Sequence, residues 1–136
     1  MLVHADVASF YPSVTPAVLA SAVTEAGGDP ADARLGADLL EGWGSEGYLG
    51  LPIGPPGSAI LANAVLRPVD RAMDGRPFLR WVDDYLIACS DERDAARALD
   101  GIDETLDRMA LRRAVAKTRM EEPRLSFRWL GISHPC

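Results

Sequence analysis

Apolar residues recur along the first half of the chain with the spacing of one strand followed by helices. The short apolar run at residues 1–6 predicts a strand that ends at an aspartate. Residues 15–26 begin with Thr-Pro and end before a Gly-Gly pair, which predicts a helix. A second amphipathic helix is expected at 31–43, and the Gly/Pro-rich stretch 44–57 is expected to be a loop. Apolar residues at helical spacing from Ile60 to Met73 predict a further helix over 58–73.

The second half alternates between strand and helix patterns. Residues 78–90 consist of two apolar runs around an acidic pair, which predicts a hairpin. Residues 91–111 have a helical pattern with an aspartate at the start, and short strands are expected at about 113–120 and 125–132. Few strands mixed with helices favour an α+β fold, in which helices back one face of a sheet.

Composition indicates a small intracellular protein. With 136 residues and 48% hydrophobic residues, the chain is long enough for one core and is one domain by length. Cys89 and Cys136 suggest no disulfide framework, so a reducing cytoplasm is the expected location. No apolar stretch approaches the ~18 residues that span a membrane. The N-terminus lacks the features of a signal peptide, so we expect no membrane association and no export.

The charge distribution bears on binding to nucleic acids. The formal net charge is −6, whereas proteins that bind phosphates usually present a basic surface. Acidic residues concentrate at 25–46 and 91–107, while 108–128 is rich in arginine. We therefore expect a basic region at one end of the molecule, although for each arginine a solvated charged face is the alternative.

The strongest chemical signal is the Asp83-Asp84 pair, together with the earlier Asp6. Aspartates supply the hard oxygen ligands that Mg²⁺ prefers, and two such metals can drive phosphoryl transfer. A plain hairpin turn is the alternative interpretation of an Asp-Asp pair, since aspartate tolerates turn geometry.

Five segments in order support the metal interpretation. They are "DVASFYPSV" from Asp6, "GLPIGPPGSAILANAVLRPVD" from Gly50, "RWVDDYLI" from Arg80, "AVAKTRM" from Ala114 and "FRWLGIS" from Phe127. In this order the chain resembles the palm of reverse transcriptases, blocks A to E. The resemblance covers essentially the whole chain. It implies a polymerase palm over residues 1–136, with a small antiparallel, ferredoxin-like sheet backed by helices.

The resemblance also implies a reaction and its metal ligands. The expected activity is RNA-directed DNA polymerisation, in which a nucleotidyl group passes from a dNTP to a primer 3′-hydroxyl. Two Mg²⁺ ions, with Mn²⁺ as the alternative, would be held by Asp6 and Asp83. The Val7 carbonyl would add a ligand, and Asp84 would support the site from the next position.

Substrate-binding positions follow from the first two blocks. Tyr11 stands where a bulky ring resembles the steric gate of reverse transcriptases, which excludes a ribose 2′-hydroxyl. Of Phe10 and Tyr11, one is expected to be a core aromatic. Gly54, in the loop before a helix, would let the backbone approach the substrate closely. Ile53 stands where many members have Gln, and this variant resembles defence-associated and abortive-infection reverse transcriptases of bacteria, which points to phage defence.

The later blocks supply further expectations. Lys117 resembles the block D lysine that neutralises the departing pyrophosphate, with a solvated lysine as the alternative. Trp129, Leu130 and Gly131 resemble the hairpin that contacts the primer. Trp81 stands where Tyr or Phe is usual before the acidic pair, and we expect it to pack under the hairpin, with contact to the primer end as the alternative.

The expected partners are an RNA template, a DNA primer and dNTP. The fingers and thumb segments that flank such a palm are absent from the sequence, so we expect the chain to work within a larger polymerase, with an inactive fragment as the alternative. Two other functions remain open: a catalytically incomplete palm that binds nucleic acid or assists assembly, and another palm enzyme such as a nucleotide cyclase or RNA-templated RNA polymerase. Retention of all three aspartates argues against the first, and Tyr11 argues against the second.

Overall fold

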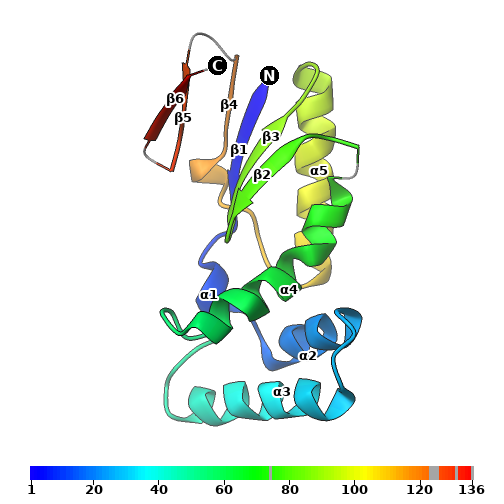
Figure 1. The fold of residues 1–136 in the computed structure, drawn as a ribbon, viewed down its shortest axis with the longest axis vertical. Helices are drawn as coiled ribbons and strands as arrows, with labels where there is room; N and C mark the ends of the chain where they lie inside the picture. Colours follow the sequence, from blue (N-terminus) through cyan, green and yellow to red (C-terminus); the bar gives the residue numbers. More distant parts are fainter. Residues whose placement is uncertain (74, 123–125, 131, 136) are drawn as a thin grey trace. The chain divides into compact units, whose positions relative to one another are not determined.

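The strand predicted at the start of the chain is an interior strand of a four-stranded antiparallel sheet. A computed structural model describes residues 1–73, 75–122, 126–130 and 132–135. The strand order is β2-β3-β1-β4, with β1 at Leu2–Asp6, β2 at Phe78–Trp81, β3 at Asp84–Ala88 and β4 at Arg119–Glu121 (Figure 1). β1 and β2 are both antiparallel to β3, so they run in the same direction with one strand between them. This split β-α-β arrangement is ferredoxin-like and confirms the predicted α+β fold.

Helix α5 (Glu92–Arg108) contacts this sheet through β1 (Figure 1). Its buried residues recur at helical spacing: Ala95, Ala98, Leu99, Ile102, Thr105 and Leu106. The helix starts at the predicted position because the Asp91 side chain accepts a hydrogen bond from the Asp94 N–H at 2.7 Å. The apolar face of α5 therefore backs the strand that carries Asp6.

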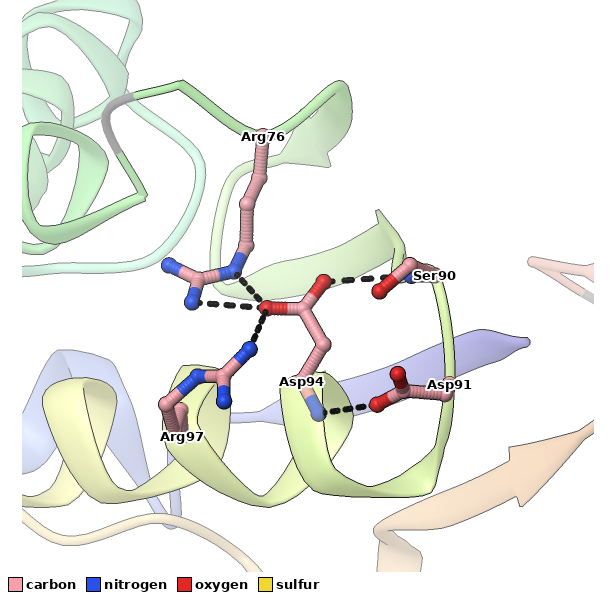
Figure 2. Close-up of polar contacts among 5 residues, drawn as sticks. All are labelled: Arg76, Ser90, Asp91, Asp94 and Arg97. Carbon is pink, nitrogen blue, oxygen red and sulfur yellow. Dashed lines mark hydrogen bonds and ion pairs between the residues drawn. The ribbon is translucent and has the colours of Figure 1, made fainter.

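An ion cluster joins the start of α5 to the segment that leads into β2. Nε and Nη2 of Arg76 donate to Oδ1 of Asp94 at 3.1 and 2.9 Å, and Arg97 donates to the same oxygen at 3.2 Å (Figure 2). The other oxygen, Oδ2, accepts from the Ser90 backbone N–H at 3.1 Å. Asp94 is thus held by partners before and within the helix, which fixes where α5 begins.

The chain divides into two compact units, one made of residues 1–8 and 69–136 and the other of residues 9–68. The second unit contains α1 (Phe10–Ser13), α2 (Pro16–Glu25) and α3 (Pro30–Ser45). α4 (Pro56–Ala72) begins in the second unit and ends in the first. Thr15 caps α2 as predicted, since its side chain accepts a hydrogen bond from the Val18 N–H at 3.3 Å.

Helix α4 confirms the predicted helix, and Val69 and Met73 of the apolar pattern are buried, whereas the start of the pattern is wrong. Its buried residues, with the residue that follows the helix, are Ser58, Ala62, Val65, Leu66, Val69 and Met73. Ile60, which the apolar pattern placed on the buried side, is 70% exposed. The buried stripe follows small residues such as Ala62 and Ser58, which an apolar pattern weighted towards large side chains does not select.

Two predictions for the C-terminal strands were wrong in detail. Residues 113–120 are not one strand, because a 3₁₀ turn, η1 (Val115–Lys117), precedes β4. Val7 pairs with Arg113 and His4 pairs with Arg119. The segment from Arg113 to Arg119 is therefore longer than the part of β1 with which it pairs, and its extra residues form the η1 turn. The predicted strand at 125–132 is instead a hairpin of β5 (Ser126–Trp129) and β6 (Ile132–Pro135), which forms its own two-stranded sheet.

The short helix α1 was not predicted from the sequence. Cys89 is buried and free, and Cys136 lies outside the described residues. Among the described helices, none combines the length and apolar character needed to cross a membrane.

Candidate active site

The acidic residues lie at one end of the β1–β3 pair. Asp6 is the last residue of β1, and the strand register places it opposite Asp84, the first residue of β3. Asp83 occupies the turn just before Asp84, and its carbonyl accepts a hydrogen bond from the Val7 N–H at 3.3 Å. The fold therefore brings residues from distant parts of the sequence to the same end of the sheet. This group of Asp6, Asp83 and Asp84 is called the acidic corner below.

The acidic corner carries more negative charge than its surroundings compensate. Burial raises the pKa of Asp83, and the nearby Asp6 carboxylate raises it further. Burial also raises the pKa of Asp84, and repulsion from Asp6 and Asp83 adds to this. Since a raised carboxyl pKa means that the charged form is disfavoured, the three carboxylates repel one another in this arrangement.

Asp6 is the buried member of the corner, with only 8% of its surface exposed. Its Oδ2 accepts a hydrogen bond from Lys117 Nζ at 2.9 Å, while Oδ1 is buried and has no hydrogen-bond partner. A buried carboxylate oxygen without a partner is costly, and a cation beside it would remove that cost.

The residues present fit a divalent cation by their chemistry. They offer hard carboxylate oxygens, one of them unpartnered, in a place where negative charge is in excess. Within the described residues, no group of three or more His, Cys, Asp or Glu side chains is already arranged to hold a metal ion. Asp6, Asp83, Asp84 and the Val7 carbonyl therefore remain candidate ligands.

Lys117 reaches Asp6 because the segment before it is fastened to two elements. The Ala114 N–H donates to the Asp6 carbonyl at 2.7 Å, which attaches the segment to β1. Arg113 donates to both oxygens of Asp103 on α5 at 2.8 and 2.6 Å, and its Nη1 donates to Thr118 Oγ1 at 2.8 Å. The pKa of Lys117 is raised by its hydrogen bond to Asp6. The η1 turn thus presents a cation to the acidic corner.

A hollow of about 370 Å³ opens beside these residues. Its lining includes Asp6, Asp84, Lys117, Thr118, Trp129 and Leu130. Trp129 Nε1 is buried and has no hydrogen-bond partner, so Asp6 and Trp129, which both line the hollow, each carry a buried polar atom without a partner. Of the residues predicted to contact a primer, Trp129 and Leu130 therefore lie at the acidic corner, while Gly131 lies outside the described residues.

The turn between β2 and β3 has unusual backbone geometry. Trp81 pairs with Asp84, which leaves Val82 and Asp83 as the two residues of the turn. Val82 has φ of 55°, a left-handed conformation that branched side chains avoid. Positive φ at the first residue occurs in the two-residue hairpin turns of types I′ and II′, where Asn, Asp or Gly is usual at that position.

Sequence reasoning missed Arg80, which contacts this turn, and Asp70, which binds the Arg80 guanidinium. Arg80 donates to the Val82 carbonyl at 2.9 Å and to both Asp70 oxygens at 2.7 Å. Asp70 is a charged residue within the apolar pattern of α4, and that position was the signal available. The expectation that Trp81 packs under the hairpin was wrong, since its side chain points to solvent and the residue is 64% exposed.

The substrate-binding positions predicted in residues 9–68 have defined surroundings within that unit. Phe10 is 2% exposed and is the core aromatic of its pair, while Tyr11 is half-buried and meets Phe10 edge-on at 5.4 Å. The Tyr11 carbonyl accepts from the Leu51 N–H at 2.9 Å, which attaches the following loop. In that loop Ile53 is 80% exposed and Gly54 has φ of 115°, which a residue with a side chain rarely adopts.

Two arginines of the basic region expected at 108–128 are paired with aspartates of α5. Arg112 contacts Asp107 at 2.9 Å and Arg113 contacts Asp103 at 2.6 Å. These arginines, together with Lys117 on Asp6, are engaged within the protein.

The amino-acid sequence matches a family of known proteins. A family model described as "Reverse transcriptase (RNA-dependent DNA polymerase)" matches residues 1–134, nearly the whole chain. No curated protein matches the chain.

Proposed function

Because this chain belongs to the reverse transcriptase family, we propose that its acidic corner carries out two-metal-ion nucleotidyl transfer from a dNTP to a primer 3′-hydroxyl. The observation that carries the proposal is the pairing of Asp6 with Asp84 beside the Asp83 turn, with Asp6 Oδ1 buried and unpartnered. Residues 1–136 are proposed to be the palm of the polymerase, with an RNA template and a DNA primer as partners.

Reverse transcriptases generally use divalent metal ions, which lower the pKa of an attacking hydroxyl and stabilise the leaving pyrophosphate. In this chain Asp6, Asp83, Asp84 and the Val7 carbonyl are the proposed ligands. Lys117 would neutralise the pyrophosphate, since its side chain is mostly exposed and its hydrogen bond to Asp6 places the amine at the corner. Trp129 and Leu130, which line the hollow, would contact the primer end, as would Gly131.

Residues 9–68 supply the proposed substrate contacts. Tyr11 would exclude the 2′-hydroxyl of a ribonucleotide, with Phe10 as the core aromatic that supports it. Ile53 and Gly54 would face the substrate. The Ile53 side chain is exposed, and Gly54 has no side chain to keep the backbone away from the substrate.

The test is incorporation of labelled dNTP on a primed RNA template by wild type and Asp83→Asn. Removal of one ligand charge should lower kcat by several orders of magnitude, on the scale of several kcal/mol of transition-state stabilisation. Asp100→Asn is the matched control, since Asp100 is an exposed aspartate on α5. A folded Asp83→Asn protein that incorporates dNTP at the wild-type rate would refute the proposal.

The alternative function is a catalytically incomplete palm that binds nucleic acid or assists assembly. The Lys117–Asp6 ion pair favours it, because Lys117 occupies one oxygen of the central candidate ligand. This alternative predicts no incorporation by wild type under any metal condition, with primer–template binding that Asp83→Asn leaves unchanged.

A role in phage defence is proposed on narrower grounds, namely Ile53 in the loop before α4. If the role is correct, cells that produce the wild-type protein should plate phage less efficiently than cells that produce Asp83→Asn. Equal plating would exclude a defence role that depends on polymerisation.

A further inference from the structure

The Val82–Asp83 turn holds a conformation that its sequence disfavours. Val82 is the first residue of a two-residue hairpin turn and has φ of 55°. In this conformation a branched side chain crowds its own backbone, and glycine would be the preferred residue. Conformations of this kind persist only where surrounding contacts enforce them, so the contacts that enforce this one are informative.

Those contacts come from Arg80 and Asp70. Nη1 of Arg80 donates to the Val82 carbonyl at 2.9 Å. The guanidinium is itself oriented by Asp70, whose two oxygens accept from Nε and Nη2 at 2.7 Å each. A forked contact of this kind fixes direction as well as distance, which a lysine could not do.

The pair is buried and supported from a second side. The side chains of Arg80 and Asp70 are 13% and 25% exposed. The Tyr85 hydroxyl donates to Asp70 Oδ1 at 3.1 Å, and the Arg80 guanidinium lies over the Tyr85 ring at 5.8 Å. Asp70 is therefore held by two donors, one on each strand of the hairpin.

The contact with the Val82 carbonyl bears directly on Asp83. That carbonyl belongs to the peptide group that joins Val82 to Asp83. The next carbonyl, that of Asp83, accepts from the Val7 N–H, so the backbone is held on both sides of the Asp83 Cα. The direction of the Asp83 side chain follows from those two peptide planes.

We propose that Asp70 and Arg80 are positioning residues that hold the strained Val82–Asp83 turn, and with it the Asp83 carboxylate, towards Asp6. The proposal rests on the proposed function, in which Asp83 is a metal ligand. The hydrogen-bonded group of Asp70, Arg80 and the Val82 carbonyl is called the clamp below. It lies outside the acidic corner, and the geometry of the corner depends on it.

Amide hydrogen exchange of the chain in the absence of metal tests the clamp, with the Val7 N–H as reporter. Arg80→Lys keeps the positive charge but cannot form the paired hydrogen bonds to Asp70. It should speed exchange of the Val7 amide hydrogen by about tenfold. Exchange at Ala88 and Cys89, whose N–H groups are bonded at the far end of the sheet, should stay within about twofold of wild type. Asp70→Asn, which removes one charged acceptor, should act in the same way.

A second substitution at Val82 distinguishes a positioning role of Arg80 from a general contribution to the stability of the sheet. Glycine accepts positive φ without crowding, so adding Val82→Gly to Arg80→Lys should restore slow exchange at Val7. The matched control is Arg76→Lys, which weakens another Arg–Asp ion pair, that with Asp94 (Figure 2), and should leave exchange at Val7 unchanged. Unchanged exchange at Val7 in Arg80→Lys, or uniform acceleration across the sheet that Val82→Gly does not reverse, would overturn the clamp.

In dNTP incorporation, Arg80→Lys should lower kcat with KM for dNTP little changed, because a misdirected Asp83 weakens the transition state rather than nucleotide binding. The exchange measurement needs neither metal nor nucleotide. Failure of the clamp is therefore distinguishable from failure of the proposed polymerase activity, which Asp83→Asn tests separately.

Discussion

The two oxygens of the Asp6 carboxylate have different surroundings. Oδ2 accepts a hydrogen bond from Lys117, and Oδ1 is buried without a partner. The Lys117 side chain is 68% exposed, so a metal ion that binds Oδ2 could displace the lysine amine into water. Within the Asp6 carboxylate, Oδ2 is paired with a cation that a metal ion can replace, and Oδ1 has no cation beside it.

At the residue scale, we predict that Asp84→Asn raises the melting temperature of the metal-free protein at neutral pH. The pKa of Asp84 is raised above its usual 3.8, so its charged form is disfavoured in the folded state. The stability of the wild type should therefore be greatest below pH 3.8 with respect to this group, and should fall as pH rises through the raised pKa. The Asp84→Asn variant has no carboxylate at this position, so its stability lacks this decrease with rising pH.

The measurement is melting temperature against pH for both proteins, where the advantage of Asp84→Asn should grow towards neutral pH. Added Mg²⁺ should then stabilise the wild type more than the variant, because the ion offsets the repulsion. Asp100→Asn serves as the control for loss of one negative charge elsewhere. An Asp84→Asn protein that melts below wild type at pH 7 would contradict the repulsion argument.

Tyr11 gives a second prediction at this scale. If its ring occupies the space of a ribose 2′-hydroxyl, Tyr11→Ala should admit ribonucleotides and retain deoxynucleotides. The measurement is the ratio of dNTP to rNTP incorporation, with melting temperatures recorded alongside. Phe10→Ala is the contrasting variant, because Phe10 is buried and its loss should appear chiefly as lost stability, about 3–5 kcal/mol. Early melting with an unchanged ratio in Tyr11→Ala would make Tyr11 a packing residue.

At the element scale, the start of α5 should lose its anchor in acid. Hydrogen bonds from the Ser90 N–H and from Arg76 lower the pKa of Asp94 to about 2 (Figure 2). A lowered carboxyl pKa stabilises the fold above the usual value of 3.8, and this contribution is lost as pH falls from 3.8 through about 2.

We therefore expect the wild type to lose stability over that acid range more steeply than Asp94→Asn. Urea unfolding at successive pH values checks this, with Asp100→Asn as the control that keeps the wild-type slope. Identical slopes for wild type and Asp94→Asn would show that the ion cluster contributes nothing that titrates.

The elements that local pattern determines were predictable, and those that distant pairing determines were not. Thr15 and Asp91 mark the starts of α2 and α5 because capping is a local interaction. The η1 turn depends on which residues of the last segment pair with β1, and the sequence near Lys117 carries no sign of that register. The same reasoning explains why Asp70 and Arg80 were missed, since their contact joins a helix to a strand.

For the acidic corner, sequence supplied the residues but not their charge balance. The order of the five segments pointed to Asp6, Asp83, Asp84 and Lys117. The unpartnered oxygen of Asp6 and the left-handed Val82 arise from burial and backbone geometry, which no residue pattern specifies.

At the scale of the whole molecule, charge should limit binding to nucleic acid. The net charge is −6, and Arg112 and Arg113 are paired with aspartates of α5. We expect this chain to bind a primer–template weakly, with log K falling against log salt by a slope of magnitude below about 2. Asp107→Asn, which releases Arg112, should strengthen binding and steepen the slope by about one unit.

Fluorescence anisotropy with a labelled primer–template between about 50 and 200 mM salt checks the slope. A slope of magnitude about 6 or more would mean that a basic surface acts despite the ion pairs. An unchanged slope in Asp107→Asn would mean that Arg112 lies away from the bound duplex.

The interruption of the first unit by residues 9–68 affects the order in which the protein can assemble during synthesis. β1 leaves the ribosome before its neighbours in the sheet, which begin only at Asp84 and Arg119. Its backbone edges therefore stay without these partners while the intervening residues are made, and the closure of such long loops slows folding. Asp6 consequently meets Asp84 and Lys117 only after the segment that carries Lys117 has been made, so a chain that stalls before that point carries no assembled acidic corner.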